Sequence, residues 1–223
     1  MRHRAVFLLS ALAIAWSGCT IIRMAAPAGL VGGGEEFSSD RPTFEWSTGM
    51  ITVGPYLVTD FAKGHGHAKR SGSSQTDQGA FSFRFREGEE ALDAQCSQTK
   101  VQSTSALWGT ITMSSSSWRL DCRCGEATLE IGGDGGETQG RAMLGGIPLV
   151  VRSAHDYDNG ARSSDPLGFS VEAGGVALGS VETRRPERIW LARDLDPDSR
   201  RHVACLLAGF FFLDTRTDHD AFE

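Results

Sequence analysis

The sequence predicts a mainly β protein: an antiparallel barrel or sandwich of ten or more short strands, with one buried C-terminal helix over about residues 197–213. Three observations indicate this fold. Phe81, Phe83 and Phe85 alternate with polar residues, as in a strand with one buried face and one face in water. The chain holds 27 glycines in 223 residues, a high proportion that is typical of many tight turns. Residues 203–213 contain no polar side chain, so a helix there must be buried on all sides.

Short segments rich in β-branched and aromatic residues, bounded by glycine and polar clusters, account for the predicted strands. The expected ranges are 43–46, 50–59, 80–86, 91–96, 100–105, 107–113, 118–122, 127–131, 147–152, 169–172, 176–182 and 188–191. Gly54-Pro55 indicates a bulge or an edge position in the second range, and Gly174-Gly175 indicates a hairpin turn. Residues 61–79 are polar and are expected to form a mobile surface loop. So many strands at close spacing favour an antiparallel sandwich or barrel.

The helix has a clear start signal. Asp196 is a capping residue, Pro197 suits the first helical position, and Asp198 places an acid in the first turn. The apolar run at 203–213 would be about 16 Å long as a helix, too short to cross a membrane. The alternative reading of this run as a buried strand is disfavoured by the Asp-Pro start.

Strands at 168–172 through 188–191, followed by an apolar helix at 197–213, resemble the C-terminal part of the tubby-like fold and its bacterial relatives. The resemblance implies a closed antiparallel barrel with the helix through its centre. In eukaryotic members a basic groove binds phosphoinositides. We do not expect that activity here, because this chain is acidic and its basic cluster is limited to Arg184, Arg185 and Arg188. A β-sandwich with the helix packed on one side is the alternative architecture.

The first residues have the three parts of a secretory signal peptide. Arg2 and Arg4 precede an apolar run over residues 5–16, and Ser17-Gly18-Cys19 follows. This tripeptide resembles the lipobox of bacterial lipoproteins. The resemblance implies that cleavage after residue 18 leaves Cys19 as a lipid-modified, palmitate-bearing N-terminus. Thr20 in place of an aspartate implies the outer membrane of a Gram-negative cell envelope.

The predicted organisation is a signal peptide at 1–18, a lipidated N-terminus and flexible tether at 19–40, and a single β-rich domain at 41–223. The tether is inferred from the glycines and small residues between Ala25 and Gly34. Loss of Arg2 and Arg4 with the signal changes the net charge from −6 to −8. Such an acidic chain is not expected to bind nucleic acid.

Cys19 also explains the odd number of cysteines, of which there are five. In an oxidising compartment the other four, Cys96, Cys122, Cys124 and Cys205, are expected to form two disulfides. Cys122 and Cys124 would lie on the same face of a strand, nearly 7 Å apart, which is poor disulfide geometry. Each is therefore expected to pair with Cys96 or Cys205, and both of these connectivities stay open.

Signals for metal binding are weak. His65 and His67 could share a metal ion, but their spacing supplies no third ligand. Asp156 and Asp158 suggest an irregular calcium loop, although the glycine and the final acid of the usual pattern are missing. We therefore predict no metal or other cofactor.

Catalytic signatures are absent from the sequence: it holds no Gly-x-Ser-x-Gly, phosphate-binding or His-Glu-x-x-His motif. We expect a lipid-anchored envelope protein with a non-enzymatic binding or structural role, in contact with the membrane through its lipid and with an envelope protein as partner. The alternatives are a secreted hydrolase with a scattered site that uses His155 or His202 as base, and a carrier of a small ligand or lipid. His202 is expected on the first, exposed turns of the helix.

Overall fold

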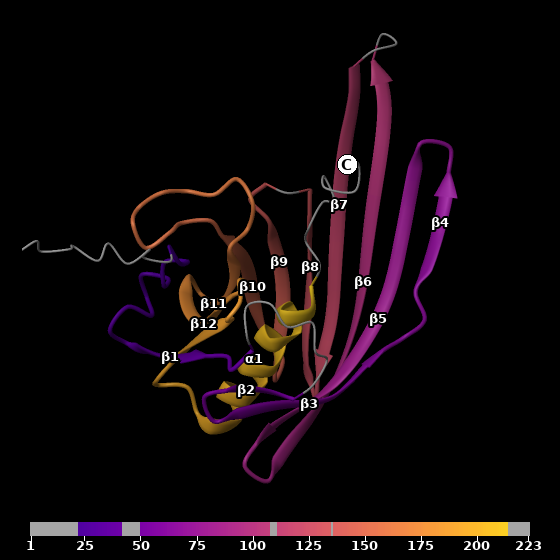
Figure 1. Ribbon diagram of the computed structural model, residues 1–223. Helices are drawn as coiled ribbons and strands as arrows, with labels where there is room; N and C mark the ends of the chain where they lie inside the picture. Colours follow the sequence, from indigo (N-terminus) through magenta and orange to yellow (C-terminus); the bar gives the residue numbers. More distant parts are fainter. Residues whose placement is uncertain (1–21, 42–49, 108–110, 135, 214–223) are drawn as a thin grey trace, which may run out of the picture.

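The computed structural model describes residues 22–41, 50–107, 111–134 and 136–213, and it confirms a mainly β fold with one C-terminal helix. One antiparallel sheet of 13 strands curls around the helix (Figure 1). The strands are β1 (Gly34–Ser38), β2 (Ile51–Val53), β3 (Tyr56–Lys63), β4 (His67–Ser71), β5 (Ser74–Glu87), β6 (Glu90–Leu107), β7 (Ile111–Cys124), β8 (Ala127–Gly133), β9 (Gln139–Leu144), β10 (Ile147–Ala154), β11 (Gly168–Ala173), β12 (Val176–Glu182) and β13 (Arg188–Ala192). Helix α1 (Pro197–Gly209) continues into a short 3₁₀ turn, η1 (Phe210–Phe212).

The sheet is nearly closed into a barrel. Its strand order is β1-β13-β12-β11-β10-β9-β8-β7-β6-β5-β3-β2, with β4 added on β5. The two ends of this series meet where Ser39 forms a bridge with Val53. Next to it, the Asp40 amide donates to the Thr52 carbonyl at 2.9 Å, and the Thr52 amide donates to the Asp40 carboxylate at 2.8 Å. The segments next to β1 and β2, the two ends of the strand order, are therefore joined by these hydrogen bonds, which close the barrel.

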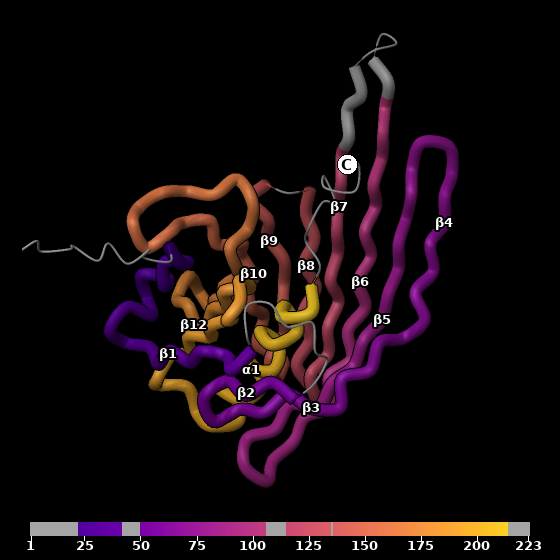
Figure 2. The backbone as a smooth tube through the Cα atoms, viewed as in Figure 1, coloured from indigo at the N-terminus to yellow at the C-terminus, as the bar shows by residue number. Residues whose placement is uncertain are grey.

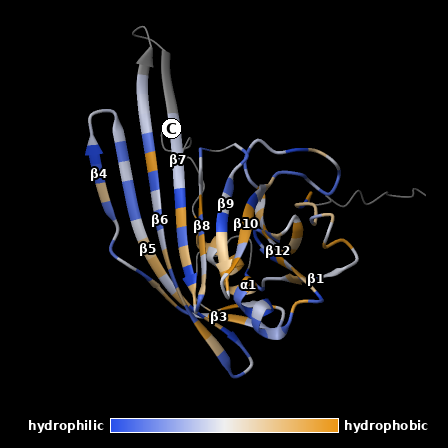
Figure 3. Cartoon of the chain, turned by 180° about the vertical axis from the view of Figure 1, so that it is seen from behind, coloured by the Kyte–Doolittle hydropathy of each residue, from blue (hydrophilic) through white to orange (hydrophobic). Residues whose placement is uncertain are grey.

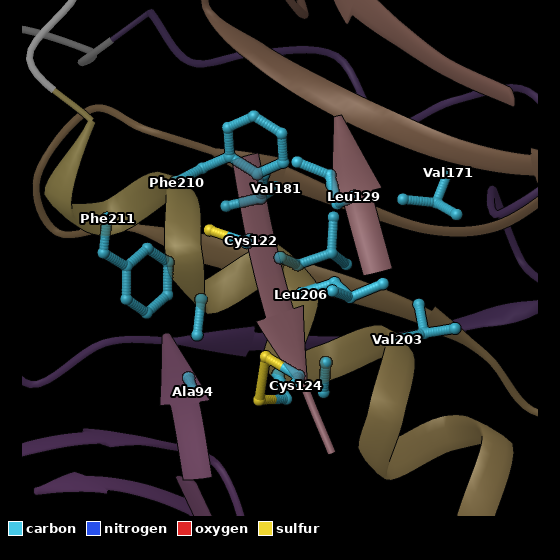
Figure 4. Packing of buried hydrophobic residues seen from close by; sticks show 14 of the residues in the cluster. Ala94, Cys122, Cys124, Leu129, Val171, Val181, Val203, Leu206, Phe210 and Phe211 are labelled. Carbon is cyan, nitrogen blue, oxygen red and sulfur yellow. A yellow bond between two sulfur atoms is a disulfide. The ribbon is translucent and has the colours of Figure 1, made fainter. Parts of the chain in front are cut away.

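Helix α1 fills the interior of this barrel. It contacts β6, β7, β8 and β9 on one side and β12 and β13 on the other. Every side chain from residue 203 to residue 208 is fully buried, and Figure 4 shows Val203, Leu206 and Phe210 among side chains from several strands. Each large apolar side chain buried in this way stabilises the fold by about 1.5–3 kcal/mol. The start of the helix is the predicted one, because the Asp196 carboxylate accepts hydrogen bonds from the amides of Asp198 and Ser199.

The strands differ from the predicted ones mainly in length. The ranges 91–96 and 100–105 belong to a single strand of 18 residues, β6. Gly54-Pro55 forms the turn between β2 and β3 rather than a bulge, and Gly54 has a φ of +58°. Gly174 and Gly175, with φ of +56° and +85°, form the predicted turn between β11 and β12. The range 43–46 and the centre of the range 107–113 lie outside the described residues.

The N-terminal segment corrects the prediction of a flexible tether over residues 19–40. From residue 22 onward this segment packs on the barrel: Met24 and Leu30 are buried, and β1 pairs with β13. The cause is the fully buried carboxylate of Glu182, which accepts hydrogen bonds from Arg23 Nε at 3.0 Å and from the Met24 amide at 3.0 Å. A buried carboxylate is costly unless it is paired, so this segment completes the fold.

Residues 61–79, predicted to be a mobile loop, are also ordered into strands. They contain the end of β3, all of β4 and the first part of β5. The paired strands β4 and β5 project from the barrel beside β6 and β7, as the tube in Figure 2 shows.

Candidate functional site

The four cysteines beyond Cys19 form two disulfides. Cys96 in β6 lies directly opposite Cys122 in β7 and is bonded to it. Cys124, two residues further along β7, is bonded to Cys205 of α1. The prediction that Cys122 and Cys124 do not pair with each other agrees with this arrangement. The second disulfide fixes the barrel wall to the central helix.

His65 and His67 do not form a metal site with other described residues. His67 is exposed in β4, and His65 is exposed in the segment between β3 and β4. Neither belongs to a cluster of three potential ligands within the described ranges. The part of the chain that the structure describes therefore supplies no third ligand for this pair.

Asp156 and Asp158 lie in a loop that is organised by protein contacts. The Asp156 carboxylate accepts a hydrogen bond from Arg162 Nη1 at 3.1 Å, and the Asp158 amide donates to the Arg23 carbonyl at 2.9 Å. Asn159 Oδ1 accepts from the Ala161 amide at 3.0 Å, which closes a side-chain turn at Gly160. Among the described residues these two aspartates belong to no cluster of three potential ligands.

His155 is buried and lies beside a hydroxyl. Its Nε2 is 2.9 Å from Ser153 Oγ, and its Nδ1 is 3.1 Å from the Ser163 carbonyl. The Ser153 hydroxyl also accepts a hydrogen bond from the Thr138 amide at 2.8 Å. The group that orients the imidazole is thus a carbonyl rather than a carboxylate, and the serine is held in a structural hydrogen-bond network.

His202 is buried, which corrects the expectation that it lies on an exposed turn. Only 5% of its surface is exposed, because its side chain packs against the β7–β8 turn at Gly125, although Pro197 and Asp198 at the start of the helix are exposed. Its neighbours include two acids, Glu126 and Asp198. The sequence analysis did not identify this group, since Glu126 is 72 residues or more from the other two.

A groove of about 600 Å³ crosses the outer face of the sheet from β5 to β9. Charged residues in and beside it are paired with one another. Arg119 is 2.8 Å from Glu130, and Arg141 is 2.6 Å from the same carboxylate. The carboxylate of Glu130, which lines the groove, therefore already has two arginine partners.

The most unusual surface is a four-strand projection, which we call the blade. It consists of β4, residues 74–80 of β5, residues 97–107 of β6 and residues 111–117 of β7 (Figures 1 and 2). No side chain of the blade whose exposure is described is buried. Figure 3 shows its largely hydrophilic colouring against the more hydrophobic barrel. The side chains of the blade whose burial is described therefore form no hydrophobic core.

The blade has two free edges within the described residues. Strand β4 is paired with β5 on one side only, and β7 gains its second neighbour, β8, only from Trp118 onward. The blade contains three basic residues and one acid, whereas the whole chain has a net charge of −6. The basic residues are Lys69, Arg70 and Lys100, and the acid is Asp77. The blade is therefore a polar, weakly basic surface on an acidic protein.

Comparisons of the chain with protein-family models, with curated proteins and with solved structures found no match. Within the described residues, no helix has the length and apolar character needed to span a membrane.

Proposed function

We propose that this chain is a lipid-anchored protein of the cell envelope with a non-enzymatic binding role, in which the barrel is the scaffold and the blade binds a protein partner. The observation that carries the proposal is the contrast between the two parts. The barrel interior is filled by α1, whereas the blade extends from it without any buried side chain among those described.

The blade contributes little to the stability of the barrel. Strands with two polar faces bury almost no apolar surface, and burial of apolar surface is the main source of folding free energy. A projection of this size is better explained by a partner than by the needs of the fold. Its free edges offer unpaired backbone groups to an added strand. Lys69 and Arg70 on β4 discourage pairing between copies of this chain, because they repel the same edge of a second copy.

The anchor is inferred from the sequence, since Cys19 lies outside the described residues. The first described residue, Ile22, is three positions from Cys19, and three residues reach at most about 10 Å. With residues 22–40 docked on the barrel, a lipid on Cys19 would hold the barrel close to the bilayer and leave the blade projecting from it.

The packing of α1 also bears on the alternative of a ligand carrier. A carrier needs an apolar cavity, and the space inside this barrel is taken by residues such as Leu206 and Phe210, both fully buried. We therefore favour binding at the surface over binding in the interior.

The binding proposal is tested by site-specific photo-crosslinking in living cells. A photoreactive amino acid at Arg70 on the blade is compared with one at Glu89, an exposed residue of the β5–β6 turn. We expect a defined cross-linked envelope protein from position 70 and none from position 89. Equal cross-linking from both positions, or none from position 70, would contradict the role of the blade.

The anchor is tested separately by labelling with radioactive palmitate. Label should appear in the wild-type chain and be absent from Cys19→Ser, which should accumulate unprocessed. Normal processing of the variant, or no label in the wild type, would exclude lipidation and leave the blade hypothesis intact.

A further inference from the structure

Strand β4 is the outermost strand of the blade (Figure 1). Among the described strands it is hydrogen-bonded to β5 alone, so one of its two sides carries backbone groups that no described strand uses. All five of its side chains are exposed. An exposed strand edge of this kind is a template on which an extended segment of another protein can pair.

The register of the β4–β5 hairpin shows which backbone groups of β4 are unused. The two strands are joined by a two-residue turn that begins at Gly72, whose φ of +59° is typical of the type II′ turns in such hairpins. The residues next to the turn exchange backbone hydrogen bonds, and the bonded pairs alternate from there. Every second residue of β4, counted back from Ser71, is therefore bonded to β5. The amides and carbonyls of Ala68 and Arg70 point to the free side.

Two cations lie beside this free side. Lys69 and Arg70 are consecutive in β4, so their side chains lie on opposite faces of the sheet. Neither forms an ion pair or a side-chain hydrogen bond with another described residue. The one acid in the blade, Asp77, lies opposite Lys100 of β6 and accepts a hydrogen bond from Gln75 at 3.1 Å. Each face of the β4 edge therefore offers a cation that can pair with a carboxylate of a partner.

We propose that β4 binds an extended segment of a partner protein as an additional strand of the blade, and that this segment carries two consecutive acids. The inference rests on the proposed function, in which the blade binds a protein. Consecutive side chains of an added strand point to opposite faces, as Lys69 and Arg70 do, so one carboxylate meets each cation. Backbone hydrogen bonds to Ala68 and Arg70 supply affinity, and the two charge pairs supply specificity.

The other free edge of the blade and a second copy of the chain fit less well. Residues 111–117 of β7 include no charged residue, so that edge has no means of selecting a partner by charge. A second copy of β4 would place Lys69 and Arg70 against the same two cations. Like charges directly opposite each other destabilise a strand pair.

The proposal is tested with two short blocked peptides, Thr-Val-Glu-Glu-Val-Thr and Thr-Val-Lys-Lys-Val-Thr. Each is titrated to millimolar concentration into the isotope-labelled mature chain, and the backbone amides are followed by NMR. We expect the acidic peptide to shift the amide signals of Ala68 and Arg70 and the basic peptide to leave them unchanged. The amide of Glu89, in the β5–β6 turn, is the internal control and should not shift with either peptide.

Charge reversal tests the two cations. In Lys69→Glu/Arg70→Glu both charge pairs become repulsive, so the acidic peptide should bind at least about 10-fold more weakly and the basic peptide should now bind. Arg86→Glu/Arg123→Glu makes the same change in net charge at two exposed residues of the barrel wall, on β5 and β7. This matched control should bind both peptides as the wild type does.

Proline substitution tests the backbone contribution. Ala68→Pro removes an amide that points to the free side and leaves the β4–β5 hydrogen bonds in place, an arrangement that edge strands tolerate. It should weaken binding of the acidic peptide about 5-fold, whereas Ala68→Val should not. Equal binding of the two peptides, or binding unchanged by both the charge reversal and the proline, would overturn the proposal.

The outcome is separable from that of the proposed function. A positive cross-link from position 70 in cells, together with no binding of the acidic peptide, would overturn the strand addition and leave the role of the blade intact. Failure of both experiments would overturn both. Concentration-dependent shifts of the Ala68 and Arg70 amides without peptide would assign this edge to a second copy of the chain and contradict the acidic partner.

Discussion

At the scale of single residues, Gly209 shows how closely α1 approaches the barrel wall. A Cβ at this position would lie 2.9 Å from Cys122 Sγ and 3.5 Å from Cys96 Sγ. We expect Gly209→Ala to lower the free energy of unfolding by about 1–3 kcal/mol, because the helix or the disulfide must shift. Urea unfolding measures the change. Gly79→Ala is the matched control, since no atom lies within 4 Å of its added Cβ; an equal loss in both variants would contradict the close packing.

Asp196 gives a pH-dependent contribution at the start of α1. Hydrogen bonds from Ser199, through its side chain first and then its amide, hold the pKa of Asp196 below its ordinary value, and the Asp198 amide adds to this effect. A lowered pKa in the folded state stabilises the fold above the unfolded pKa of about 3.9. This contribution is lost as the pH falls through the lower folded value.

We therefore expect Asp196→Ala to have a lower Tm than the wild type at neutral pH, with the difference shrinking below about pH 4. Asp196→Asn, which keeps the capping oxygen without the charge, should have a Tm between those of the wild type and Asp196→Ala at neutral pH. A wild-type-to-alanine difference that is unchanged between neutral and strongly acidic pH would contradict this role.

His202 marks the limit of prediction at the residue scale. In the sequence it stands just before the apolar run, so its exposure depends on which turn or strand packs against that side of the helix. The nearby Glu126 belongs to the turn between β7 and β8, which lies close only because the sheet curls around α1. For the cysteines, strand geometry excluded one pairing, but the choice between the other two depends on which strand lies against Cys205.

At the scale of secondary-structure elements, predictions succeeded where the burial of an element leaves a clear pattern of apolar residues in the sequence. Phe81, Phe83 and Phe85 are buried as their alternation indicates, and the apolar helix is surrounded by sheet. The extension of β6 beyond Cys96 was missed as part of a continuous strand, because a strand in water on both faces has no hydrophobic periodicity. Strand β1 was missed because an ion pair from Arg23 and a hydrogen bond from the Met24 amide to the distant Glu182, rather than an apolar pattern, help to hold the adjoining segment.

The two disulfides are expected to stabilise the fold unequally. Cys124 and Cys205 are separated by 81 residues and Cys96 and Cys122 by 26. In the chain-entropy account the longer closed loop stabilises by about 1 kcal/mol more. Urea unfolding of the Cys124→Ala/Cys205→Ala and Cys96→Ala/Cys122→Ala variants compares them. A larger loss in the second variant would contradict the expectation, and mass mapping should find none of the four thiols free in the wild type.

At the scale of the whole molecule, the sequence predicted strands around a buried helix but left open whether they form a barrel or a sandwich. The choice depends on the contact between Ser39 and Val53, which joins the two ends of the strand order. The resemblance to the tubby-like fold and the lipobox both stay predictions. The structure adds a filled barrel and a blade without a buried side chain among those described, and the proposed function depends on this contrast.

Hydrogen exchange followed by mass spectrometry tests most directly the contrast between the filled barrel and the exposed blade. On the mature chain, the account predicts that amides at 203–209 in α1 exchange only through global unfolding. Amides at 97–105 in the blade, whose side chains are at least partly exposed, should exchange faster. Exchange of the α1 amides as fast as that of the blade would contradict the central claim that this helix is the core of the fold.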